Sequence, residues 1–65
     1  MIEFTRGQVV HVNHPGLGYT YDGIVIERDE AGDYIVMDAD GWCDDFSPCF
    51  LTSAGWTAEL EEVKP

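Results

Sequence analysis

A chain of 65 residues with thirteen acidic side chains and three basic ones carries a formal net charge of −10. This balance excludes direct binding to DNA, RNA or anionic membranes, because such binding depends on Lys and Arg side chains that neutralise phosphates. The length fits one small domain, residues 1–65, with too little volume for a deep catalytic cleft. The hydrophobic content of 45% favours a folded chain over a disordered one.

The N-terminus has no basic segment followed by a long apolar run, so no signal peptide is expected. No apolar stretch approaches the ~20 residues of a membrane span. We therefore expect a cytoplasmic protein, in which Cys43 and Cys49 remain thiols.

The first predicted strand is the β-branched run at residues 8–12. Because side chains alternate along a strand, Val10 and Val12 share one face, and Val9 and His11 share the other.

A loop is expected next, at residues 13–22, where a Pro-Gly dipeptide marks a turn. Leu17, Tyr19 and Tyr21 make this loop apolar enough to fold back over one end of a sheet.

Three further strands are expected at residues 23–28, 33–39 and 42–46, joined as a meander. A Gly-containing loop of four or five residues links the first two. Asp40-Gly41, the strongest short hairpin signal in the chain, links the second to the third.

Pro48 ends the meander because it cannot donate a ladder hydrogen bond, and residues 48–51 predict a single 3₁₀ turn. Residues 52–55 are expected to form a connector. Residues 56–63 fit either a helix or an alternating strand, and we favour a strand because closing a barrel removes exposed edges.

Several short motifs occur in a fixed order: Arg6-Gly7-Gln8-Val9-Val10-His11-Val12, Gly23 opening a strand, Gly32-Asp33-Tyr34-Ile35-Val36, Asp40-Gly41, and Phe46-Ser47-Pro48 before Leu51. Together they resemble the SH3-like small β-barrels of the KOW and Tudor type. The resemblance implies an all-β fold, a five-stranded SH3-like barrel with a long first loop and a 3₁₀ turn before the last strand. RNA-binding KOW domains are usually basic, so the acidity of this chain separates it from their function.

A Tudor-type domain that reads methyl-lysine needs an aromatic cage. Tyr19, Tyr21, Trp42 and Phe46 are the residues that would supply one here. The sequence does not establish that their rings meet.

Acidic residues in and beside the meander suggest the function. We expect a surface that imitates the phosphates of a nucleic acid and blocks a basic groove of a nucleic-acid-handling protein, as small phage-encoded inhibitors do. Aromatic anchors at the centre would carry most of the binding energy. The predicted binding residues are Glu27, Asp29, Tyr34, Asp38, Asp40, Trp42, Asp44 and Asp45.

The central strands carry more apolar surface than one small core uses. Some of Val9, Val25, Tyr34, Val36 and Trp42 should therefore lie outside the core, as an apolar strip rimmed by acids. Such a strip binds a protein partner or a second copy. The alternative function is therefore a structural or accessory module, or a homodimer, whose acidity only keeps it soluble.

A further alternative is a small domain stabilised by zinc. Its candidate ligands are His11, His14, Cys43 and Cys49, although the two cysteines are spaced more widely than in most zinc sites. A disulfide between the two cysteines is another reading.

The remaining acids and nucleophiles do not predict an enzyme or a cofactor. The aspartates around Asp40-Gly41 lack the spacing of a calcium-binding EF-hand. Ser47 and Ser53 have no convincing base beside them, and a reactive thiolate needs a more electropositive setting than this chain offers.

Overall fold

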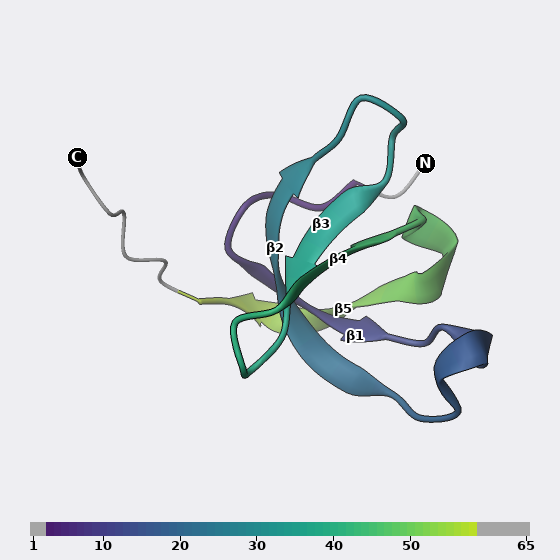
Figure 1. Ribbon diagram of the computed structural model, residues 1–65. Coiled ribbons are helices and arrows are strands. Elements are labelled where there is room, and N and C mark those ends of the chain that lie inside the picture. The colour runs from purple at the N-terminus through teal and green to yellow at the C-terminus, as the bar shows by residue number, and fades with distance from the viewer. Residues whose placement is uncertain (1–2, 59–65) are drawn as a thin grey trace.

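The computed structural model describes residues 3–58, which form one antiparallel sheet of five strands (Figure 1). The strand order across the sheet is β4-β3-β2-β1-β5. Two single 3₁₀ turns accompany the strands. The elements are β1 (Gln8–Val12), η1 (Pro15–Leu17), β2 (Tyr21–Arg28), β3 (Tyr34–Met37), β4 (Cys43–Phe46), η2 (Pro48–Phe50) and β5 (Leu51–Thr57).

The predicted all-β class is confirmed, but the sheet is not closed by hydrogen bonds. Strands β4 and β5 form its two edges, and within residues 3–58 no ladder joins them. The long strand β2 pairs with β1 through its first half and with β3 through its second half, and a bulge lies between Val25 and Glu27. A bulge bends its strand, and Figure 1 shows the sheet curling along β2.

The boundaries differ from the prediction mainly after β4. Strand β1 and the turn at Pro48 lie where they were expected. The connector expected at residues 52–55 is wrong, because β5 begins at Leu51 and pairs at once with β1, Leu51 opposite Val12. Of the strand predicted at 56–63, residues 56–57 belong to β5, and residues 59–63 lie outside the described part of the chain.

The core lies on the inner face of the curled sheet, where alternate side chains of every strand meet. Val10 and Val12 share this face, as predicted, and Leu17 and Tyr21 pack against it from the first loop. The buried cluster is Phe4, Val10, Val12, Val25, Tyr34, Val36, Phe46 and Leu51.

Some of Val9, Val25, Tyr34, Val36 and Trp42 were expected outside the core; Trp42 is exposed, and the other four are buried. The expected place of Tyr34 in a binding surface is therefore wrong. Tyr34 is 1% exposed. Its hydroxyl accepts a hydrogen bond from the backbone N–H of Phe4 at 3.0 Å, and the two rings meet edge to face at 5.3 Å. Because this hydrogen bond satisfies the hydroxyl, Tyr34 can be buried on the inner face of its strand despite its polar tip.

The two hairpins of the meander are closed by the same five-residue loop, at residues 29–33 and 38–42. In each, the first Asp accepts hydrogen bonds from the backbone N–H groups of the third and fifth residues, at 3.0 and 2.9 Å in one loop and 2.9 and 3.0 Å in the other. The fourth residue, Gly32 or Gly41, has a φ of 88°. Asp40-Gly41 is thus the middle of a loop that Asp38 opens, and not a two-residue turn.

Candidate functional site

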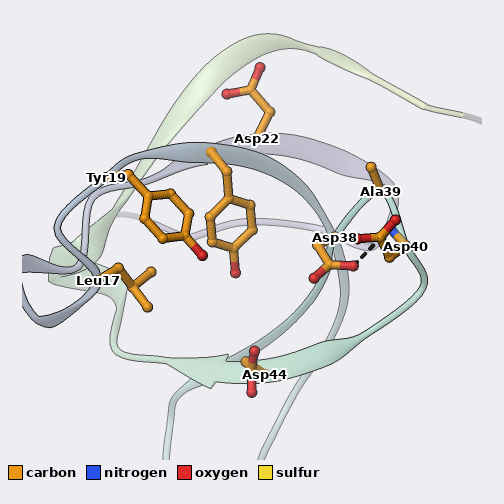
Figure 2. Close-up of a pocket in the computed structure, with 8 residues that line it drawn as sticks. Leu17, Tyr19, Asp22, Asp38, Ala39, Asp40 and Asp44 are labelled. Carbon is orange, nitrogen blue, oxygen red and sulfur yellow. Dashed lines mark hydrogen bonds between the residues drawn. The ribbon is translucent and has the colours of Figure 1, made fainter.

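One end of the sheet carries a pocket of about 270 Å³, between the loop after β1 and the hairpin loop at residues 38–42 (Figure 2). Small-molecule sites usually begin near ~300 Å³, so this pocket is sized for a single side chain. Tyrosines and aspartates dominate its lining, which consists of Leu17, Tyr19, Tyr21, Asp22, Asp38, Ala39, Asp40 and Asp44. We call it the acidic pocket.

The aromatic side of the acidic pocket comes from the end of the first loop. Gly18 has a φ of 70° after η1 and turns the chain toward β2. Tyr19 and Tyr21 then alternate onto the same side, with ring centroids 6.2 Å apart. Tyr21 is held by the core through Phe46, at 6.4 Å, whereas Tyr19 is 63% exposed.

The acidic side comes from β4 and from the loop at residues 38–42. Asp38 and Asp44 both line the pocket, and the Asp38 carboxylate accepts a hydrogen bond from the backbone N–H of Asp40 (Figure 2). Burial raises the pKa of Tyr21, and the charges of Asp44 and Asp38 raise it further. The potential at this phenol is therefore negative, which favours a cationic ligand.

Both arginines lie toward the other end of β2. The Arg6 guanidinium donates to the carbonyl oxygen of Ile26 at 3.1 Å. Arg28 lies 3.6 Å from Glu3 and stacks over Tyr34, 5.4 Å from the ring centroid. Among residues 3–58, no Lys or Arg lines the acidic pocket.

Asp22 stands at the rim of the pocket and has a partner of its own. It is opposite His11 in the pairing of β1 with β2, and its carboxylate lies 2.5 Å from His11 Nδ1. In Figure 2 its carboxylate points away from Leu17 and Asp44. Asp38 and Asp44 are therefore the carboxylates best placed to meet a ligand inside the pocket.

The structure brings three of the predicted binding residues together, namely Asp38, Asp40 and Asp44. Trp42 is 73% exposed on the same hairpin but does not line the pocket. Glu27 is exposed on β2, opposite Ile35, and Tyr34 belongs to the core.

Asp29 and Asp45 form a separate pair of carboxyl groups at the opposite hairpin. Hydrogen bonding to Asp29 raises the pKa of Asp45, and desolvation and the charges of Asp29, Asp33 and Asp44 raise it further. For Asp29, desolvation acts to raise the pKa, but hydrogen bonds from the backbone of its own loop and from Asp45 lower it overall. Of the two carboxyl groups, Asp45 is therefore the one that takes up a proton first as the pH falls. Neither Asp29 nor Asp45 lines the acidic pocket.

Sequence reasoning placed Leu17, Tyr19 and Tyr21 over the sheet end but left them out of the binding set. The signal for Tyr19 and Tyr21 was their spacing of two residues where the chain enters a strand, because such spacing puts both rings on one face. The four-ring cage is not assembled, because Phe46 is buried and Trp42 projects from its hairpin.

The candidate zinc ligands are dispersed. His14 packs against Phe50 at 4.5 Å, and its Nδ1 accepts a hydrogen bond from the backbone N–H of Gly16. Cys43 and Cys49 are exposed free thiols. Within residues 3–58, no three side chains of His, Cys, Asp or Glu are grouped to hold a metal ion.

Comparison with protein-family models, curated proteins and solved structures gives no significant match to this chain. The fold and the pocket define a small all-β domain of five antiparallel strands with an acidic, aromatic pocket at one end of the sheet. No helix within residues 3–58 is long and apolar enough to cross a membrane.

Proposed function

We propose that this chain is a non-enzymatic protein-binding domain that seats a basic side chain of its partner in the acidic pocket. The observation that supports this function is the meeting of Tyr19 and Tyr21 with Asp38 and Asp44 in a space for one side chain. A cation there lies against aromatic faces and donates charge-assisted hydrogen bonds to the carboxylates.

The proposed partner is a nucleic-acid-handling protein with a basic groove. A net charge of −10 attracts clustered Lys and Arg side chains, which in such proteins otherwise contact phosphates. Occupying that groove makes the domain an inhibitor that imitates nucleic-acid charge, as expected of a phage-encoded protein. The acids outside the pocket then raise the association rate and make it sensitive to salt.

We also propose that the curled sheet is an SH3-like barrel. Three features support this: the order β4-β3-β2-β1-β5, the long loop between β1 and β2, and the 3₁₀ turn immediately before β5.

A pair of neighbouring substitutions tests the function. Asp44→Asn and Asp45→Asn change the net charge equally, but only Asp44 lines the pocket. With a synthetic Arg-rich peptide as ligand, we expect Asp44→Asn to weaken binding about tenfold, equivalent to about 1.4 kcal/mol, and Asp45→Asn to have much less effect. Titration calorimetry at low and at physiological ionic strength measures both.

Equal losses in the two variants would show that the peptide responds to overall charge and not to the acidic pocket. If the affinity is the same at low and at physiological ionic strength, the proposal that the domain imitates nucleic-acid charge is wrong. Tyr19→Phe serves as the control for the aromatic contact, because it keeps the ring, whereas Tyr19→Ala removes it from an exposed position and should weaken binding.

A further inference from the structure

An apolar groove of about 180 Å³ lies on the outer face of the sheet, next to the acidic pocket. Its lining is Val9, Asp22, Gly23, Ile24, Met37, Asp38, Ala39 and Trp56. Three of these residues, Asp22, Asp38 and Ala39, also line the acidic pocket. The two hollows therefore share a wall, with apolar side chains on one side and tyrosines and carboxylates on the other.

Strand register builds the floor of the groove. Val9 on β1 lies opposite Ile24 on β2, and Ile24 lies opposite Met37 on β3. These side chains point away from the core, because their neighbours along each strand are the buried ones. The strands thus lay a continuous apolar row across the outer face.

A bulge in β5 supplies the side wall. Gln8 pairs with Thr57 and Val10 with Ser53, so residues 54–56 of β5 face Val9 alone. Gly55 occupies this bulge with a φ of 91°. Bulges re-aim side chains, and here Trp56 lines the groove while 59% exposed, whereas Val9, which also lines it, is only 2% exposed.

The charges around the groove decide what occupies it. The carboxylates of its shared wall favour an apolar side chain that comes with a basic neighbour, and they oppose an acidic one. A second copy of this chain is a poor occupant, since a two-fold interface sets the same surface patch against itself and so brings Asp22 and Asp38 of both copies into one interface.

We propose that the partner binds through one segment that places an apolar side chain in this groove and a neighbouring basic side chain in the acidic pocket. The inference rests on the proposed function, because the acidic pocket is its second half. The motif recognised on the partner protein is then a basic residue beside an aliphatic or aromatic residue.

The experiment uses synthetic peptides of equal charge. Each contains one Arg and one Leu, either adjacent or separated by one, two or three glycines, and each has a matched peptide in which Gly replaces the Leu. NMR titration of the full chain measures each affinity. At the best spacing, we expect the Leu peptide to bind about tenfold more tightly than its Gly match, because burying a Leu side chain is favourable. Trp56→Ala should abolish that difference.

Trp42→Ala is the matched control, because Trp42 is 73% exposed and lines neither hollow, so this variant should keep the tenfold difference. Trp56→Phe should keep most of the difference in affinity between the Leu and Gly peptides, and it remains informative if Trp56→Ala fails to fold. If Asp44→Asn weakens binding but Leu and Gly peptides bind the wild type equally, the groove inference is wrong and the proposed function stands. If Asp44→Asn changes no peptide's affinity, the proposed function itself fails.

Discussion

Asp44 on β4 and Tyr21 on β2 line one pocket, although β3 lies between their strands in the sheet. The curl of the sheet brings the two together, and the carboxylate charge is one cause of the raised pKa of the phenol, after burial. The pKa of Tyr21 therefore reports on how near the Asp44 carboxylate lies to the phenol in the pocket.

Asp44→Asn should lower the pKa of Tyr21 toward its ordinary value of 10.0, because the variant removes a negative charge that disfavours the phenolate. NMR titration of the tyrosine ring resonances measures the change. Asp40→Asn, which alters the net charge equally, is the control, since Asp40 lines the pocket without contributing to the shift. An unchanged Tyr21 pKa in Asp44→Asn would contradict the close approach of the two groups.

Alternation along the strands was enough to predict which residues share a face, but not which face turns inward. In β1 the pattern distinguishes Val10 and Val12 from a face that contains His11. In β3 both faces are apolar, so Tyr34 and Val36 look no more suited to the core than Ile35 and Met37. The inner face of β3 meets Phe4, thirty positions from Tyr34, whose backbone N–H donates to the Tyr34 hydroxyl, and no local pattern carries that contact.

The candidate site was predicted only in part, again because some of its contacts are not local in the sequence. Asp38, Asp40 and Asp44 cluster in sequence around one hairpin, so their grouping follows from local structure. Tyr19 and Tyr21 join them only through the curl of the sheet. The bulge that brings Trp56 to the groove lined by Val9 was missed, because a connector was expected there and Gly55 was read as part of it.

Asp45→Asn should stabilise the fold near neutral pH, because an amide donates to Asp29 without adding a second negative charge. Since the pKa of Asp45 is raised above its ordinary 3.8, the wild-type fold takes up a proton more readily than the unfolded chain and gains stability as the pH falls through that raised pKa. The advantage of the variant should therefore be largest at neutral pH and shrink in mild acid.

Thermal unfolding from about pH 7 down to about pH 4 measures this difference. In still stronger acid, both proteins should lose stability as Asp29, whose pKa is lowered, becomes protonated. Asp40→Asn is again the control for net charge. A constant gap between Asp45→Asn and the wild type across this range would show that Asp29 and Asp45 do not share a proton.

Substitutions at two glycines distinguish the cost of backbone strain from the cost of steric overlap. Gly41 has a φ of 88° with open space where a Cβ atom would lie, so Gly41→Ala should cost only the left-handed strain, about 1–2 kcal/mol. A Cβ atom at Gly23 would overlap Cγ1 of the buried Val36 and lie 3.0 Å from the carbonyl oxygen of Met37. Gly23→Ala should therefore cost more, about 3 kcal/mol or above.

Urea unfolding of both variants measures the comparison. Gly18→Ala offers a second case of pure strain, because Gly18 also has a positive φ and open space around it. Equal losses in Gly23→Ala and Gly41→Ala would mean that β2 and β3 do not approach each other as closely as described.

The twin hairpin loops should respond differently to loss of their first Asp. Asp38→Ala removes two hydrogen bonds to the backbone of loop 38–42 and should cost about 1–2 kcal/mol, as loss of a capping side chain does. Asp29→Ala removes the equivalent pair from loop 29–33 but also frees Asp45 from a neighbouring charge, so its net cost at neutral pH should be smaller. Asp38→Asn keeps an acceptor oxygen and should retain most of the stability, which makes it the control. Chemical unfolding at neutral pH ranks the three variants, and a larger loss in Asp29→Ala than in Asp38→Ala would contradict the account of the Asp29–Asp45 pair.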